Sequence, residues 1–305
     1  MVHKLLMNNN YSIIYNPISG NGKANHLVKK LQEDFNQRKI KYTIYQSQYS
    51  GHIKSLCMNK GLKNFIIIGG DGTFNEALNG FMKRPNKSYE NINVGFLPGG
   101  TGNSFMHDLN GATYQKALKI ILNGQTKRID VLKLNFNKNL SNFSYSLNIV
   151  GWGLASDINI LSDKLRFLGG VRYNVASLYY IFNKQVRSAT ITIDKKSNYK
   201  KYLFVMCLNT MHTGKGMKAA PNAKLDDGLF DVIIINAKIS KFKLLQLLPK
   251  LFTGDHIFSK DVEYLQAQYL EIDSDSIDVL NIDGENKFNT PVSISIVPKV
   301  LNIFY

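Results

Sequence analysis

Three glycine-rich segments, each directly behind an apolar run, hold the residues of this sequence best suited to chemistry. They are NPISGNGKAN at 16–25, GGDGT at 69–73 and PGGTGNS at 98–104. Glycine lets backbone N–H groups approach a phosphate, and a helix that begins behind such a segment adds the positive end of its dipole. One such segment predicts only a turn, but three at the edge of one sheet predict a phosphate-binding site.

Asp71 is the carboxylate within these segments. One interpretation makes it a turn former or a helix N-cap ahead of Phe74. The other makes it a metal or hydroxyl partner beside a transferred phosphate, because positioning and charge neutralisation dominate phosphoryl transfer. Neither GxxxxGK[ST] nor GxGxxG is present, so the sequence predicts neither a P-loop nor a standard dinucleotide fingerprint.

The elements that must position these segments alternate over the first 130 residues. Short apolar runs typical of buried strands alternate with helical patterns such as Leu27, Leu31 and Phe35 on one face. The expected strands are 11–15, 42–46, 64–70 and 94–100, and the expected helices are 26–37, 52–61, 74–81 and 114–124. This order predicts a mostly parallel, doubly wound sheet, in which ligands bind at the carboxyl ends of the strands.

After about Val131 the pattern changes to short β-rich runs separated by Gly, Asn and Asp. These runs predict an antiparallel sandwich or barrel. Two helical insertions are expected, one at 162–183 and one at 240–254 with Ser240 as its N-cap. The second insertion is either a core-packing or an interfacial amphipathic helix.

The chain has 305 residues and a formal net charge of +16. This charge favours anionic partners such as nucleic acid, an acidic membrane face or a phosphorylated ligand, although a solvated basic surface explains it equally well. Cys57 and Cys207 form no zinc or disulfide pattern. With no signal peptide and no run of about 18 apolar residues, we expect a cytoplasmic protein that meets a membrane only at its surface.

Together with NPISG and LPGGTGN, the segment GGDGTFNEALNG resembles the catalytic domain of the diacylglycerol kinase and sphingosine kinase superfamily. NAD kinases and ATP-dependent phosphofructokinases share GGDGT, whereas the following Asn75 and Glu76 resemble the lipid kinases. The resemblance continues through 151–174, 220–232 and NIDGE at 281–285, so it spans nearly the whole chain.

The resemblance implies an N-terminal doubly wound α/β domain and a C-terminal β-sandwich domain with the active site in the cleft. The first would span 1–131, with 295–305 returning to it, and the second 132–294. Asp71 matches an aspartate proposed as base or magnesium ligand, and Glu285 matches the proton acceptor of bacterial diacylglycerol kinases. The positions that match ATP contacts are Asn16, Pro17, Ile18, Ser19, Gly20, Ser47, Gly70, Asp71, Gly72, Thr73, Phe74, Asn75, Glu76, Gly100, Thr101, Gly102, Arg166 and Arg172.

KLDDGLF at 224–230 favours a tight turn, and its carboxylates and carbonyls also suit a hard cation. The resemblance to bacterial members implies a structural Mg²⁺ held by Asp227 with the carbonyls of Lys224 and Leu229. A separate, catalytic Mg²⁺ would arrive with ATP.

The lipid-recognition segment departs from the sphingosine kinase pattern, in which a second acidic residue contacts the long-chain base. Asp157 remains here as a substrate residue, but Asn159 replaces the second acid. Because an amide cannot pair with an ammonium group as a charge, this weakens the sphingosine interpretation and leaves diacylglycerol, ceramide or another neutral lipid alcohol open; the expected acceptor is diacylglycerol or a sphingoid- or ceramide-type lipid. The basic and aromatic residues at 162–183 also fit an amphipathic helix with a solvated basic face.

The sequence therefore predicts an ATP- and Mg²⁺-dependent lipid kinase with a lipid alcohol substrate, peripherally associated with an anionic membrane surface. The alternatives are a soluble-substrate kinase of the NAD kinase type and a non-catalytic nucleotide-binding membrane regulator. We expect no nucleic-acid partner, because no helix-turn-helix, RNP or zinc pattern is present. A homodimer is left open.

Overall fold

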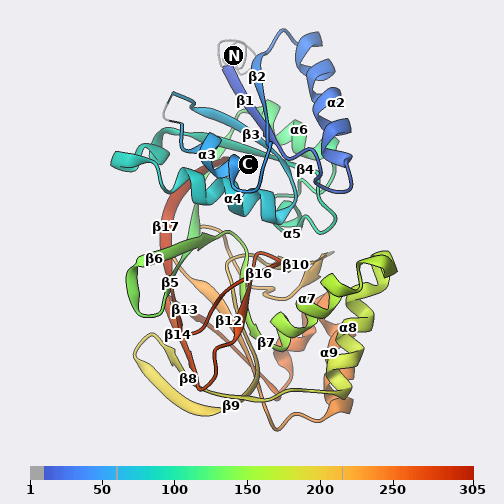
Figure 1. The fold of residues 1–305 in the computed structure, drawn as a ribbon, viewed down its shortest axis with the longest axis vertical. Coiled ribbons are helices and arrows are strands. Elements are labelled where there is room, and N and C mark those ends of the chain that lie inside the picture. The colour runs from blue at the N-terminus through green and yellow to red at the C-terminus, as the bar shows by residue number, and fades with distance from the viewer. Residues whose placement is uncertain (1–9, 60, 215) are drawn as a thin grey trace. The chain divides into compact units, whose positions relative to one another are not determined.

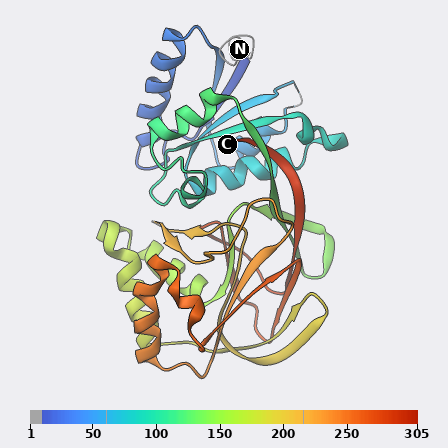
Figure 2. The same ribbon diagram turned by 180° about the vertical axis from the view of Figure 1, so that it is seen from behind.

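The computed structural model describes residues 10–59, 61–214 and 216–305. It divides into two compact units, of which one contains Met1–Val131 and Pro298–Tyr305 and the other Leu132–Val297. Two long strands, β5 (Thr126–Phe136) and β17 (Val292–Phe304), belong to both units. Figure 1 and Figure 2 show the chain from opposite sides.

The first unit is built on a parallel sheet with the order β17-β4-β3-β1-β2. Its core strands β1, β3 and β4 are almost entirely buried, as expected for a parallel sheet covered on both faces. The bounds of its strands are β1 Asn10–Tyr15, β2 Lys41–Gln46, β3 Asn64–Gly69 and β4 Asn93–Pro98.

Helices cover both faces of this sheet (Figure 1, Figure 2). α2 (Lys23–Gln37) and α6 (Tyr114–Asn123) are joined by a hydrogen bond from Tyr114 to Asp34 of 2.7 Å. α3 (His52–Cys57) packs on α4 (Asp71–Phe81), and Gly80 allows this close approach because a Cβ there would lie 2.4 Å from the Lys54 carbonyl oxygen. The shorter segments are η1 (Pro85–Asn91) and α5 (Ser104–Asp108).

Three predicted helix boundaries in this unit are wrong. α2 begins at Lys23 rather than at His26. α3 ends at Cys57 rather than at Gly61. α4 begins at Asp71 rather than at Phe74, and its N-cap is Gly70, which has no side chain to act as a cap. Asp71 is therefore the first residue of α4 and not its N-cap, which overturns the capping interpretation of this carboxylate.

The second unit is a β-rich body in which every pairing of known register is antiparallel. Its core surrounds the fully buried Trp152. The strand bounds are β6 Asn139–Ser146, β7 Ile149–Gly153, β8 Arg187–Ile193, β9 Lys196–Leu208, β12 Phe230–Asn236, β13 Val262–Ala267, β14 Tyr269–Ser274, β15 Val279–Ile282 and β16 Glu285–Asn289, with a small hairpin of β10 His212–Thr213 and β11 Met217–Lys218.

Helices α7 (Leu154–Lys164), α8 (Arg172–Phe182) and α9 (Lys241–Thr253) belong to this second unit. The short η2 (Arg166–Val171) precedes α8, and η3 (Asp255–Phe258) follows α9. The predicted N-cap of α9 is confirmed, because Ser240 Oγ accepts a hydrogen bond of 3.3 Å from the Lys243 N–H. In the described part of the chain, no helix is long and apolar enough to cross a membrane.

Candidate active site

The three glycine-rich segments lie in backbone contact at the carboxyl ends of β1, β3 and β4. The Gly99 N–H donates to the Gly69 carbonyl at 2.7 Å. A Cβ on Gly20 would lie 2.1 Å from the Gly99 oxygen, and one on Gly100 would lie 2.4 Å from Gly70 Cα. Such distances exclude any side chain, so the glycines are required for the segments to meet.

Side chains also connect the first segment to the second. Asn16 Oδ1 accepts the Ile18 N–H at 3.1 Å and closes the turn that follows β1. Ser19 Oγ lies 3.1 Å from Thr73 Oγ1 in the first turn of α4. The second of these interactions joins two residues, Ser19 and Thr73, that were predicted to contact ATP from separate segments.

The N-terminus of α4 lies within the second glycine segment. Its N-cap is Gly70, which carries no side chain and so leaves backbone groups to form this end of the helix. Backbone donors at this end of the helix dipole favour a phosphate group. The arrangement therefore suits the nucleotide phosphates that the sequence predicts here.

The Asp71 carboxylate ties the second segment to the third. Its Oδ2 accepts the Ser104 N–H at 3.0 Å and its Oδ1 the Phe105 N–H at 3.2 Å, at the start of α5. Asn103, which was not among the predicted site residues, fixes the same segment. It exchanges two hydrogen bonds of 2.9 Å with the backbone of Gly100. The terminal Asn of the quoted motif LPGGTGN was the signal that could have identified it.

The other residues predicted to contact ATP differ in how exposed their side chains are and in which protein groups they already bind. Phe74 and Asn75 are buried, the Phe74 ring packs edge-on against Phe96, and the Phe74 N–H donates to the Gly70 carbonyl at 3.0 Å, so Phe74 offers a ligand neither its ring nor its N–H. Glu76 Oε1 accepts the Lys54 N–H of α3 at 3.3 Å. Ser47 is buried and donates to the Tyr49 carbonyl at 3.2 Å, whereas Thr101 is exposed.

In the second unit, Glu285 follows a tightly anchored turn between β15 and β16. Asp283 accepts four hydrogen bonds of 2.7–3.0 Å, from the Ser146 hydroxyl and from the backbone N–H groups of residues 147–149. The Gly284 N–H donates to Asn281 Oδ1 at 3.0 Å. Glu285 itself is exposed and forms an ion pair of 3.0 Å with Lys287.

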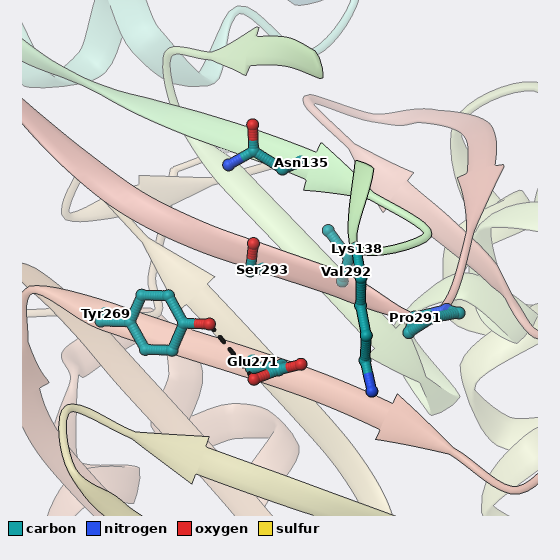
Figure 3. Close-up of a pocket in the computed structure, with 7 residues that line it drawn as sticks. All are labelled: Asn135, Lys138, Tyr269, Glu271, Pro291, Val292 and Ser293. Carbon is teal, nitrogen blue, oxygen red and sulfur yellow. Dashed lines mark hydrogen bonds between the residues drawn. The ribbon is translucent and has the colours of Figure 1, made fainter. Parts of the chain in front are cut away.

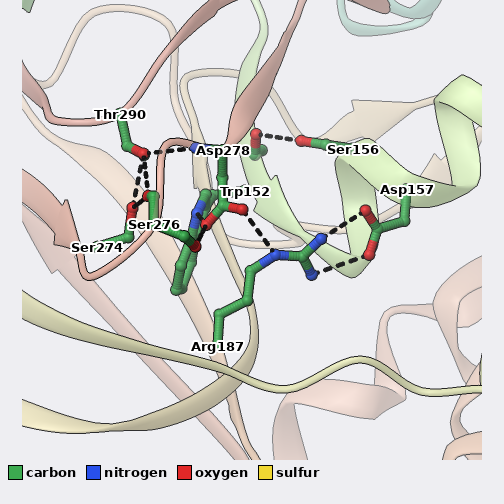
Figure 4. A network of polar contacts seen from close by, with 9 residues as sticks. Trp152, Ser156, Asp157, Arg187, Ser274, Ser276, Asp278 and Thr290 are labelled. Atoms are coloured by element: carbon green, nitrogen blue, oxygen red, sulfur yellow. Dashed lines mark hydrogen bonds and ion pairs between the residues drawn. The ribbon is translucent and has the colours of Figure 1, made fainter.

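Asp157 lies in a buried polar network rather than on an open surface (Figure 4). Both its oxygens accept from Arg187, at 2.9 and 2.7 Å. Arg187 Nε also donates to Asp278 at 3.1 Å, and the other Asp278 oxygen accepts from Trp152 Nε1 at 3.1 Å. Burial acts to lower the pKa of Arg187, but these two carboxylates outweigh it and raise that pKa. The sequence pattern gave no sign of Arg187.

Asn159 also lies in the interior, and its amide contacts the turn before Glu285. Of the two predicted arginine contacts, Arg172 places its guanidinium 4.9 Å from the ring centre of Tyr173. The side chain of Arg166 lies outside the described part of the structure.

The DDG segment forms the expected tight turn. Asp227 Oδ1 accepts the Leu229 N–H at 3.1 Å, and Gly228 has a φ of 75°. Over the residues the structure describes, no three His, Cys, Asp or Glu side chains gather as metal ligands. One carboxylate with two turn carbonyls nevertheless fits a hard cation that keeps several waters.

Asp231, two residues behind this turn, is almost fully buried in β12. Burial raises its pKa to about 6, and the charge of Asp227 acts in the same direction, while the hydroxyl of Tyr264 donates to Asp231 and opposes the rise.

A pocket of about 200 Å³ lies on β5, β14 and β17 of the second unit, lined by Lys138, Tyr269 and Glu271 among others (Figure 3). None of the predicted site residues lines it. What marks the candidate site among the described residues is its backbone contacts and carboxylates.

The fold and these motifs have known counterparts. Residues 10–134 match the model of the diacylglycerol kinase catalytic domain, and residues 148–305 match that of the YegS C-terminal NAD kinase β-sandwich-like domain. A diacylglycerol kinase of Staphylococcus carnosus is 27% identical over 90% of this chain and 87% of its own. Sphingosine kinase 1 of Arabidopsis thaliana is 25% identical over 90% and 67%.

A solved structure of a diacylglycerol kinase from Bacillus anthracis shares the fold, with a TM-score of 0.72 at 21% identity over 97% of this chain and 96% of that one. The chain belongs to the lipid kinase family that these two domains define, and it is a phosphotransferase. The predicted fold class, an α/β unit followed by a β-sandwich unit, is confirmed.

Proposed function

We propose that this lipid kinase transfers the γ-phosphate of ATP to a lipid hydroxyl in a Mg²⁺-dependent reaction. The observation that supports this most is the backbone contact of three glycine segments beside the N-terminus of α4. Preorganised N–H groups stabilise phosphate charge without reorganisation during the reaction.

The first unit is proposed to hold the nucleotide. The backbone of residues 16–20 and 70–76 would bind the phosphates, together with Gly100, Thr101 and Gly102. Ser47, at the end of β2, would be a further contact, and Arg166 and Arg172 of the second unit would add positive charge. Mg²⁺ bound with ATP would neutralise charge on the phosphate oxygens.

Asp71 and Glu285 are proposed to have different tasks. Asp71 accepts two backbone N–H groups, so its orientation is fixed, and this suits a group that positions the phosphate or its metal ion. Glu285 is exposed at the end of a rigid turn. A general base needs an accessible carboxylate within hydrogen-bond reach of the hydroxyl, so we assign that role to Glu285.

A structural Mg²⁺ is proposed for the turn at Asp227. The Asp227 carboxylate and the carbonyls of Lys224 and Leu229 would supply its protein ligands. Its task there would be to hold the turn, apart from phosphate transfer.

The acceptor is proposed to be an uncharged lipid alcohol such as diacylglycerol or ceramide. The Asp157 carboxylate is already neutralised by Arg187, and Asn159 is an amide. Neither residue therefore offers the unpaired negative charge that would favour the ammonium group of a sphingoid base. The name of the Staphylococcus carnosus relative, diacylglycerol kinase, agrees with this choice.

An anionic membrane surface is the proposed location of the reaction, and α8 is the proposed contact. Its outward face is apolar at helical spacing, with Val175, Leu178, Tyr179 and Phe182 each 41–54% exposed. No acidic residue occurs from 164 to 193, whereas Lys and Arg occur repeatedly. An apolar helix face with basic neighbours favours binding to anionic lipid.

The test of the proposed function is phosphate transfer from radiolabelled ATP to a panel of lipids in mixed micelles. We expect a labelled neutral lipid alcohol, dependence on Mg²⁺, and a loss of at least about 100-fold for Asp71→Asn. The control is Asp273→Asn, at an exposed ion pair with Lys138. If no lipid is labelled, or if Asp71→Asn retains wild-type activity, the proposal is wrong.

A further inference from the structure

Asn159 forms a clasp between α7 and the turn that precedes Glu285. It is 3% exposed. Its Nδ2 donates to the Gly284 carbonyl at 2.9 Å and to Asn286 Oδ1 at 3.2 Å. Its Oδ1 accepts the hydroxyl of Tyr173 from α8 at 3.3 Å. Both amide hydrogens and one acceptor position are thus occupied by the protein itself.

The contacts of Asn159 lie on both sides of Glu285. Asp283 fixes the beginning of the turn through its four hydrogen bonds to residues 146–149. Asn159 then fixes Gly284 and Asn286, the two neighbours of Glu285 in the chain. The contact to Gly284 is with its backbone carbonyl and the contact to Asn286 is with its side chain, so the backbone directly before Glu285 is held and the residue directly after it is anchored through its amide.

We propose that Asn159 is a positioning residue for Glu285 and not a contact of the lipid acceptor. This inference rests on the proposed function, in which Glu285 is the general base. When a catalytic group is misplaced by about 1 Å, the reaction rate falls on the order of 100-fold. By holding the residues next to the general base, Asn159 therefore affects the rate of phosphate transfer. It has no direct effect on affinity for a lipid that it does not touch.

The amide is required because only an amide supplies these donors. An ionised aspartate has the same shape but accepts hydrogen bonds only. Asn286 can turn its own amide nitrogen toward such a carboxylate, but the Gly284 carbonyl cannot become a donor. Aspartate at position 159 would therefore place two oxygens against each other and release Gly284.

The experiment compares Asn159→Asp and Asn159→Ala with wild type by two measurements on the full chain. The first is steady-state kinetics with the lipid that the panel identifies, giving kcat and the lipid KM separately. The second is amide hydrogen exchange in the segment 283–287. Tyr173→Phe, which removes the donor to Oδ1 and a long contact of 3.5 Å from Arg172, is the milder variant should the others fold poorly. Ser156→Ala is the control, since Ser156 is buried on the same helix but donates to the Gly151 carbonyl.

We expect kcat to fall at least about tenfold in Asn159→Asp and Asn159→Ala, with the lipid KM within about twofold of wild type. Exchange at 283–287 should rise about tenfold in both. Tyr173→Phe should change both quantities less and in the same direction, and Ser156→Ala neither. An increase in KM at constant kcat, with unchanged exchange, would show that Asn159 contacts the acceptor and would overturn the inference.

The exchange measurement separates this inference from the proposed function. If wild type labels no lipid but exchange at 283–287 still rises in the variants, the clasp stands and the proposed function fails. If exchange is unchanged in both position-159 variants and in Tyr173→Phe, the clasp is wrong, whatever the enzyme phosphorylates.

Discussion

At the scale of single residues, the motif carboxylates of this chain differ in the donors that surround them. Asp71 and Asp283 accept backbone N–H groups from distant segments, and Asp157 accepts the guanidinium of Arg187. Glu285 is exposed beside Lys287. An acceptor already occupied by fixed donors holds structure in place, whereas an exposed one can exchange a proton with a substrate.

The buried Asp231 should make stability depend on pH. Its pKa in the folded protein is about 6, above the ordinary value, chiefly because of burial. A raised pKa means that the folded state holds the proton more tightly than the unfolded state. The contribution to stability is therefore complete below about pH 4 and is lost as the pH rises through about 6, amounting to about 3 kcal/mol.

This dependence is measurable by urea unfolding across that pH range. The free energy of unfolding should include a component that decreases as the pH rises, and Asp231→Asn, which does not titrate, should lack it. An identical pH profile for wild type and Asp231→Asn would contradict the assignment to this carboxyl.

At the scale of elements, the second unit is held together by polar contacts between segments that are far apart in the chain. The Arg187 network joins α7, β8 and the segment between β14 and β15 through Asp157 and Asp278 (Figure 4). Buried charges of this kind need partners, because an unpaired charge in the interior is strongly unfavourable.

Asp157→Ala should therefore destabilise the protein strongly. The guanidinium of Arg187 would keep only Asp278, and the expected loss is about 3–5 kcal/mol of the free energy of unfolding. Urea denaturation measures this loss, and Asp273→Ala, at the exposed pair with Lys138, should change stability little. Equal effects of the two substitutions would show that burial does not strengthen the Asp157 pair.

At the scale of the whole molecule, the proposed membrane contact would combine the net charge of +16 with the apolar face of α8. Long-range attraction brings a basic protein to an anionic surface, and exposed apolar side chains then hold it there. Helix α9 packs one side against the core of the second unit. Its Leu244 and Leu247 are buried, whereas Phe242 and Phe252 are exposed. The buried leucines agree with the core-packing interpretation of α9, and the interfacial interpretation stays a prediction.

The double variant Leu178→Glu/Tyr179→Glu should bind anionic vesicles at least about tenfold more weakly than wild type, because it removes apolar contact and adds negative charge. Co-sedimentation with vesicles rich in anionic phospholipid measures this binding, which should also weaken as salt shortens the Debye length. Ile277→Glu is the matched control, since Ile277 is 81% exposed beside acidic residues. Equal binding of wild type to neutral vesicles would contradict the role of charge.

The amino-acid sequence by itself determined the order of elements and the classes of motif in this protein. The buried face of α2, the N-cap Ser240 and the glycine segments behind β1, β3 and β4 follow from local periodicity and turn chemistry, which act over a few residues. The start of α4 did not follow from such local signals. Its N-cap Gly70 lies in contact with Gly100 of another segment, and this contact is formed only in the folded chain.

Only the tertiary structure decided the partners of the polar groups. Asp71 meets α5 across 33 residues of sequence, Asp157 meets Arg187 across 30, and Asp283 meets the backbone of Leu147 across 136. Such pairs depend on how strands and helices are brought together, and no local pattern encodes that arrangement. For this reason a motif could indicate that Asn159 matters, but only the folded chain shows that its amide is directed at the turn before Glu285.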